Sequence, residues 1–108
     1  MTTVNPTLKA GTGSKVLRLQ PSVDLVASTV EAQRSAMMKA LETRPGAPVV
    51  LDLGSVEELD SLGITLVLGL FKTCQKAGAA FSLEAVKPDL MRVFRLFNLP
   101  KFFPIAEA

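Results

Sequence analysis

The chain has 108 residues, of which 48% are hydrophobic, and its formal net charge is +2. This length and apolar content suffice for one domain with a core that needs no disulfide or metal, and so small a charge does not provide the basic surface of a nucleic-acid-binding protein. The chain contains no histidine and one cysteine, which excludes histidine-based acid–base catalysis, a Cys–His nucleophile, an intrachain disulfide and metal sites built on His and Cys.

The sequence also lacks targeting and cofactor signals. No apolar run approaches the roughly 20 residues of a membrane helix, and residues 1–8 lack the apolar centre of a signal peptide. The single cysteine fits a reducing compartment. The glycines form no phosphate-binding pattern, and Gly11-Thr12-Gly13 is typical of a turn. We therefore expect a soluble, cytoplasmic protein that binds no cofactor, metal or nucleic acid and does not insert into a membrane.

The start of the chain predicts a tail followed by two strands. Residues 1–6 are expected to form a flexible tail, and residues 7–108 a single domain. A short edge strand is expected over residues 7–10. Polar and apolar residues alternate over residues 15–19, which indicates a half-buried strand that ends before Gln20-Pro21-Ser22.

A helix is predicted over residues 25–42, because apolar or small residues recur there with helical spacing. Either Ser22 or Asp24 is its expected N-terminal cap, since the oxygens of these side chains accept hydrogen bonds from the first N–H groups of a helix. Arg44-Pro45-Gly46 is expected to end the helix.

The middle of the chain predicts a central strand and a strongly apolar helix. Residues 48–53 are rich in Val and Leu and indicate the strand, and residues 54–59 are expected to form a loop. A helix is predicted over residues 62–77, with Gly78 as its C-terminal cap. Because residues 64–71 carry no charge, one face of this helix is expected to meet the sheet and another face to meet something else.

The last part of the chain predicts one more strand–helix unit. A third strand is expected over residues 80–86, a helix from Pro88 to about Asn98, and a final short strand over residues 102–105. Strands that alternate with helices in this order predict an α/β domain with a partly parallel sheet and right-handed crossovers.

The last predicted helix and the residues after it carry more apolar side chains than one buried stripe requires. These side chains are Leu90, Met91, Val93, Phe94, Leu96, Phe97, Leu99, Phe102 and Phe103. Two interpretations are open. The aromatic residues could close the core, or they could form, with Arg92 and Arg95, an exposed apolar and basic patch for a partner or a homodimer.

The candidate functional site is the Asp60-Ser61 pair, which follows the central strand and its loop and precedes the apolar helix. One interpretation is structural, because Asp and Ser are preferred helix caps. The other is functional, because sites in open α/β sheets gather beyond the carboxyl ends of strands. A phosphate on Ser61 would meet the positive end of the helix dipole, while Asp60 would repel it. Any partner docked over the site would encounter the added charge.

These residues resemble a known family motif. The strand Val49–Leu53, the sequence Asp60-Ser61-Leu62-Gly63 and the apolar helix behind it look like a STAS domain, the domain of bacterial anti-sigma factor antagonists. Val86-Lys87-Pro88 and the helix after it are similar to the last strand and helix of that family. The resemblance covers residues 14–105 and implies a sheet of four to five mixed strands, with three to four helices packed mainly on one side.

The resemblance implies a non-enzymatic role in signalling. In similar proteins a partner anti-sigma factor that is also a serine kinase phosphorylates the Ser after the motif Asp, here Ser61. The unphosphorylated protein binds that partner, phosphorylation releases it, and a phosphatase restores binding. The residues that the resemblance assigns to partner binding are Asp24, Asp60, Ser61, Leu62 and Gly63.

The sequence also departs from the common motif. Leu62 stands where many members have a second Ser, so no neighbouring hydroxyl could replace Ser61. Pro21 stands where many have Gly, and Glu57-Glu58 adds acidic charge beside the site. The alternative function is therefore a constitutive STAS subunit of a larger assembly, such as a lipid-transport ATPase complex or a stress or chemosensory scaffold, with Ser61 serving only as a helix cap.

Overall fold

The computed structural model describes residues 7–11 and 15–108, so the expected tail over 1–6 and most of the turn after Gly11 lie outside the described residues. The described residues form one five-stranded sheet, three α-helices and a short 3-10 helix. The strands are β1 (Leu8–Gly11), β2 (Leu17–Pro21), β3 (Val49–Asp52), β4 (Phe81–Val86) and β5 (Ile105–Glu107). The helices are α1 (Val30–Thr43), α2 (Ser61–Lys76), α3 (Pro88–Leu96) and the 3-10 helix η1 (Leu99–Lys101).

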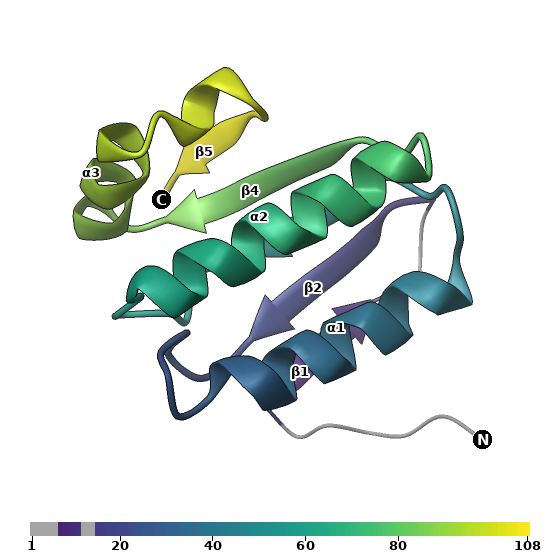
Figure 1. The fold of residues 1–108 in the computed structure, drawn as a ribbon, viewed down its shortest axis with the longest axis horizontal. Coiled ribbons are helices and arrows are strands. Elements are labelled where there is room, and N and C mark those ends of the chain that lie inside the picture. The colour runs from purple at the N-terminus through teal and green to yellow at the C-terminus, as the bar shows by residue number, and fades with distance from the viewer. Residues whose placement is uncertain (1–6, 12–14) are drawn as a thin grey trace.

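The strands lie in the sheet in the order in which they occur in the chain. β1 is antiparallel to β2, and the remaining neighbours are parallel. Because each parallel crossover advances to the next strand, and such crossovers are right-handed, successive helices fall on the same face of the sheet. Figure 1 shows α1 and α2 side by side across that face. The expected mixed α/β fold, with helices mainly on one side, is confirmed.

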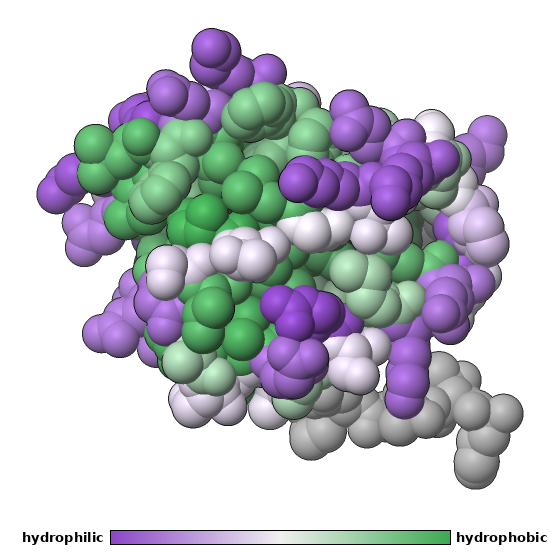
Figure 2. Space-filling model, viewed as in Figure 1, coloured by the Kyte–Doolittle hydropathy of each residue, from purple (hydrophilic) through white to green (hydrophobic). Residues whose placement is uncertain are grey.

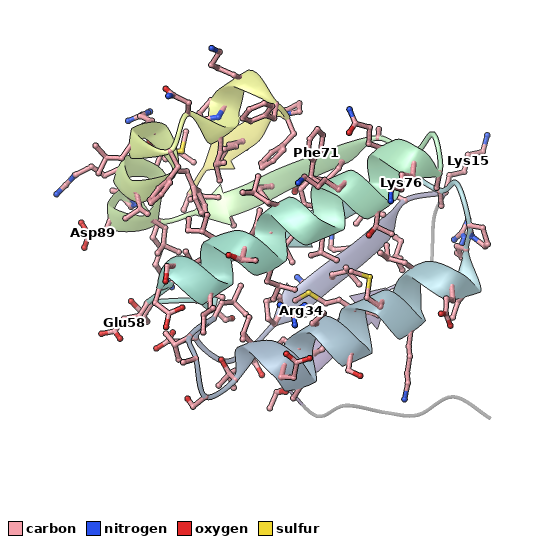
Figure 3. All side chains as sticks on the ribbon, viewed as in Figure 1. Lys15, Arg34, Glu58, Phe71, Lys76 and Asp89 are labelled. Carbon is pink, nitrogen blue, oxygen red and sulfur yellow. The ribbon has the colours of Figure 1, made fainter. Side chains whose placement is uncertain are left out.

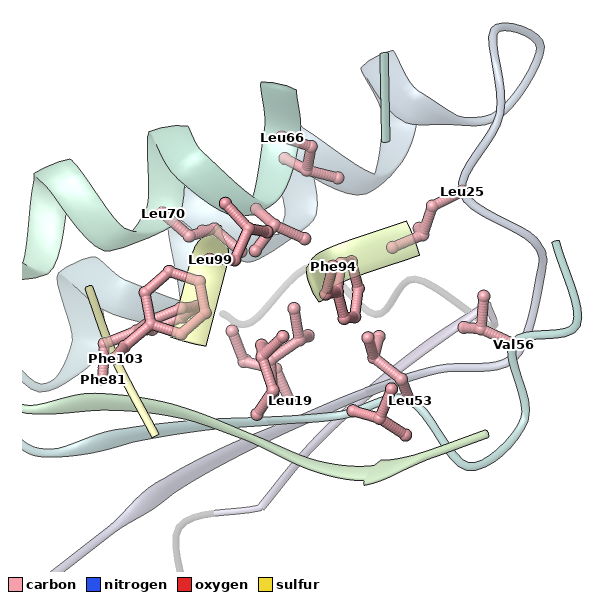
Figure 4. Packing of buried hydrophobic residues seen from close by; sticks show 14 of the residues in the cluster. Leu19, Leu25, Leu53, Val56, Leu66, Leu70, Phe81, Phe94, Leu99 and Phe103 are labelled. Atoms are coloured by element: carbon pink, nitrogen blue, oxygen red, sulfur yellow. The ribbon is translucent and has the colours of Figure 1, made fainter. Parts of the chain in front are cut away.

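The core lies between this face of the sheet and the helices. Alternation along β2 turns Leu17 and Leu19 inward, where both are completely buried together with Leu51 of β3. Phe94 of α3 and Leu99 of η1 close the core from the helical layer, as Figure 4 shows. None of the described helices is long and apolar enough to cross a membrane.

The prediction for the start of the first helix was wrong. α1 begins at Val30 rather than at residue 25, and neither Ser22 nor Asp24 caps it. The preceding residues instead pair with the loop after β3: Leu25 forms an isolated parallel bridge with Leu59 and is completely buried. Leu25, which contributed to the helical spacing, is thus buried by a tertiary contact and not by a helix.

The boundaries of two strands also differ from the prediction. β2 continues through Pro21. Proline has no N–H to donate, but the pairing of β2 with β3 extends only to Leu19, so no residue of β3 needs a hydrogen bond from Pro21. β5 forms over Ile105–Glu107 instead of residues 102–105. A left-handed turn at Asn98 (φ 58°), the 3-10 helix η1 and residues 102–104 lie between α3 and β5.

Gly69 in the middle of α2 offers a stability test. A Cβ built at Gly69 has no neighbour within 4 Å, so packing inside the described chain gives no reason for glycine there. We expect Gly69→Ala to raise the free energy of unfolding by about 1 kcal/mol, because alanine loses less backbone entropy in a helix. Urea denaturation followed by circular dichroism measures this change. Unchanged or lower stability would contradict the prediction.

Candidate functional site

α2 is capped by Asp60, whose extended backbone turns the chain into the helix. Its Oδ1 atom accepts hydrogen bonds from the N–H groups of Leu62 (2.9 Å) and Gly63 (3.1 Å). Its Oδ2 atom accepts from the N–H group of Ala27 at 2.9 Å. One carboxylate therefore accepts hydrogen bonds from the first N–H groups of α2 and also connects the helix to the segment that precedes α1.

Ser61 is the first residue of α2 and not its cap, so the structure corrects the expected capping role of Ser61. Ser61 is exposed, and within the described residues its hydroxyl makes no hydrogen bond. Its carbonyl oxygen accepts from the hydroxyl of Thr65 at 3.0 Å. The side-chain oxygen is thus free to react at a positive helix end.

Asp24 makes a second connection between the segment before α1 and the loop that leads to α2. Its Oδ1 atom accepts from the N–H groups of Glu57 (2.8 Å) and Glu58 (3.1 Å). The resemblance assigned Asp24 to partner binding, and the structure brings Asp24 to the loop that precedes Ser61. Asp24 and Asp60 therefore form reciprocal ties, each from one segment to the backbone of the other.

Backbone pairing completes this junction between the segment before α1 and the loop after β3. The N–H of Leu25 donates to the carbonyl of Glu58 (3.1 Å), and the N–H of Asp60 donates to the carbonyl of Leu25 (3.2 Å). We call residues 24–27 and 57–63 together the junction. In Figure 3, Glu58 marks this end of α2 and Lys76 marks the other end.

Gly63 and Leu62 have different places in the junction. Gly63 is buried, and a Cβ built on it would lie 2.3 Å from the carbonyl oxygen of Leu25. Only glycine allows the backbone of α2 to approach the preceding segment so closely. Leu62 has 44% of its surface exposed and is the one large apolar side chain at this end of α2 that is available for contact with a partner, among the described residues.

Lys87 is a junction-supporting residue that sequence reasoning missed. Its Nζ atom donates to the carbonyls of Gly54 (2.7 Å) and Val56 (3.3 Å) and lies 3.2 Å from the carboxylate of Glu57. It therefore fixes the loop after β3 to the start of α3. The only local signal is a lysine directly before Pro88, which does not by itself indicate a partner so distant in sequence.

Asp52, at the end of β3, fixes the beginning of the same loop. Its Oδ1 atom accepts from the N–H of Gly54 at 2.9 Å, and its Oδ2 atom accepts from Gln20 (2.9 Å) and Arg18 (3.3 Å) of β2. Burial raises the pKa of Asp52, but these hydrogen bonds and the nearby guanidinium outweigh burial and lower the pKa below its ordinary value. The loop is thus held at both ends by carboxylates.

The carboxylate of Asp60 leads us to expect that acid weakens the junction. The N–H groups of Gly63, Ala27 and Leu62 hold the pKa of Asp60 below its ordinary value. A carboxyl with a lowered pKa in the folded state stabilises the protein above its unfolded-state pKa, and this contribution disappears as the pH falls through the folded-state pKa. We expect the melting temperature to fall on acidification below about pH 4.

The matched control for this acid sensitivity is Asp60→Asn, since asparagine is also a good helix cap but does not titrate in this range. Thermal melts of both proteins between neutral and acidic pH are the measurement. The variant should lose less stability than the parent on acidification. Parallel pH profiles for the two proteins would show that Asp60 makes no contribution.

The described residues offer little for metal binding or for thiol chemistry. They contain no group of three or more His, Cys, Asp or Glu side chains that could hold a metal ion. Cys74 is buried in α2, and burial raises the pKa of its thiol. A less acidic thiol is a poorer nucleophile at neutral pH. The junction therefore combines a free hydroxyl, fixed carboxylates and one exposed apolar side chain.

Comparison with known proteins agrees with this fold. The family model for the STAS domain matches residues 5–108. The anti-sigma F factor antagonist of Paenibacillus polymyxa is 29% identical over 92 residues, which are 85% of this chain and 79% of the relative. A crystal structure of a Thermotoga maritima protein has a TM-score of 0.86 at 20% identity and covers 95% of this chain and 88% of its own. The structure of the anti-sigma factor antagonist SpoIIAA in its unphosphorylated form has a TM-score of 0.69 at 18% identity. The match covers 94% of this chain and 87% of the SpoIIAA chain.

Proposed function

The chain belongs to the STAS domain family, and we propose that it is a phosphorylation-regulated binding module of the anti-sigma factor antagonist kind. In this proposal the unphosphorylated protein binds an anti-sigma factor that is also a serine kinase. Phosphorylation of Ser61 releases the partner, and a phosphatase restores binding. Similarity to a named anti-sigma F factor antagonist over most of both chains supports the general role.

The observation that carries the proposal is the uncommitted hydroxyl of Ser61. Asp60 performs the capping task, so the exposed Ser61 can accept a phosphate without removing a hydrogen bond from α2. The γ-phosphoryl group of ATP would move to Oγ of Ser61, the bond to the β–γ bridging oxygen would break so that ADP leaves, and the hydroxyl proton would pass to a base of the kinase. The comparison with SpoIIAA also supports a regulated state, since that protein is described in an unphosphorylated form.

The junction residues take different parts in this proposal. Leu62 and Ser61 are exposed and would contact the partner directly. Asp24 and Asp60 would act by holding the two segments in one arrangement, because their carboxylates are engaged with backbone N–H groups. Gly63 is buried and would act by permitting that arrangement rather than by contact.

Mass spectrometry of the protein from its native cells tests the proposal. We expect one phosphate on Ser61 in protein isolated with phosphatase inhibitors, and none after phosphatase treatment. Ser61→Ala should carry no phosphate under either condition. Persistent absence of the modification, or its location on another residue, would refute the switch even if the protein still bound an anti-sigma factor.

A further inference from the structure

Large apolar side chains lie exposed where α3 ends and η1 follows. Leu96 is 77% exposed, Phe97 55% and Phe102 54%. Figure 2 shows an apolar area that runs over α3 and η1 and reaches α2. We call Leu96, Phe97 and Phe102 the α3–η1 patch. Phe94 and Phe103 close the core, as the first sequence interpretation expected, whereas these three side chains are exposed.

The geometry of α3 explains why Leu96 cannot join the core. The buried side of the helix carries Leu90, Met91 and Phe94. Leu96 follows Phe94 by two positions, which turns its side chain by roughly 200° around the helix axis, away from the sheet. A single exposed leucine would need no explanation, but neighbouring exposed apolar side chains mark an interaction surface.

The patch continues onto α2 through an aromatic contact. The ring centroids of Phe102 and the half-buried Phe71 lie 6.2 Å apart at a tilt of 45°. Phe71 in turn contacts the buried Phe103 at 5.2 Å. The patch is thus supported by the core: Leu96 ends α3, Phe97 follows it directly, and Phe102 follows η1 directly.

The charges around the patch are mainly positive. Arg92 lies 3.5 Å from Asp89, and Arg95 lies 3.3 Å from Glu107, so these two cations already have partners. Lys72 follows Phe71 directly, and Lys101 directly precedes Phe102. Both lysines are exposed, and neither forms a salt bridge within residues 7–11 and 15–108.

We propose that the α3–η1 patch binds an amphipathic helix of a partner protein, one whose apolar side is bordered by Asp and Glu. The apolar side would cover the exposed aromatic rings, and the acidic border would face Lys72 and Lys101. A second copy of this chain fits less well. A two-fold interface across the patch would bring each lysine towards a surface of the same sign.

The Phe102 end of this surface, which contacts Phe71, lies away from the proposed phosphorylation site. Phe71 follows Ser61 by ten residues, or about 15 Å along α2. That distance exceeds the Debye length of about 8 Å at physiological ionic strength. Docking at the α3–η1 patch should therefore not depend on the charge at Ser61. This inference goes beyond the proposed function.

Two synthetic helical peptides with the same Leu and Phe residues, bordered either by Glu or by Lys, provide the probe. Amide chemical shifts of the labelled full chain would locate binding. We expect the Glu peptide to shift the amides of Leu96, Phe97 and Phe102 and to bind about tenfold more tightly than the Lys peptide. Equal affinities, or shifts confined to other residues, would overturn the proposal.

Two variants complete the test. The double variant Leu96→Ser and Phe102→Ser should fold normally, because both side chains are exposed, and should lose the Glu peptide. Leu62→Ser removes an exposed leucine elsewhere and should retain it, as should Ser61→Asp. Undiminished binding by the double variant, or loss of binding in Ser61→Asp, would overturn the proposal. A dimer in sedimentation runs that disappears in the double variant would assign the patch to a second copy instead.

Discussion

Gly63→Ala should lower the free energy of unfolding by about 3 kcal/mol. The added Cβ would lie 2.3 Å from the carbonyl oxygen of Leu25 and 2.7 Å from Cγ of Leu59. The carbonyl of Leu25 cannot retreat freely, because it accepts the hydrogen bond from the N–H of Asp60. Relief of the clash must therefore move the first turn of α2 away from the segment before α1. Urea denaturation followed by circular dichroism measures the loss.

Gly69→Ala is the matched control, since it is the same substitution in the same helix at a site with open space. The two variants should change stability in opposite directions. If Gly63→Ala were as stable as the parent, the close contact between α2 and Leu25 would not exist in solution. A loss of stability in both variants would instead indicate that α2 tolerates no change of this kind.

Much of the fold follows from local sequence pattern. The apolar strand β3, the uncharged first half of α2 and the glycine after it are strong signals, and the structure places those elements within one or two residues of the prediction. The start of α1 does not follow from pattern, because residues 25–29 have helical spacing and yet Leu25 pairs with Leu59 of the loop after β3. A pattern along one segment does not reveal which other segment will pair with it.

The candidate site, too, was predictable only in part from local sequence pattern. The pair Asp60-Ser61 marks a helix start in the sequence, but both residue types are good caps, so the pattern cannot decide between them. The extended backbone of Asp60 decides it in the structure and leaves Ser61 free. Lys87, at the start of α3, donates a hydrogen bond to the loop after β3. This contact joins residues far apart in the sequence, so no local pattern predicts it.

Ser61→Asp should weaken binding of the partner anti-sigma factor by about 100-fold, because an unpaired charge buried in an interface costs several kcal/mol. The folded state should change little. Ser61 is exposed and makes no side-chain hydrogen bond within the described residues, and an acidic residue at a helix start is favoured by the dipole although Asp60 opposes it. Titration calorimetry with the anti-sigma factor recovered from the same cells measures the affinity, and thermal melts confirm folding.

Two further variants separate the position of the charge from charge in general. Thr73→Asp puts the same charge on an exposed site of α2 twelve residues later, about 18 Å along the helix, and should leave the affinity almost unchanged. Ser61→Ala should keep both binding and stability, because Asp60 rather than Ser61 caps α2. If Ser61→Asp bound as tightly as Ser61→Ala, a charge at this position would not control the interface, and the free hydroxyl at the start of α2 would have no regulatory consequence. If Thr73→Asp weakened binding equally, the partner would respond to the overall charge of the helix and not to the junction.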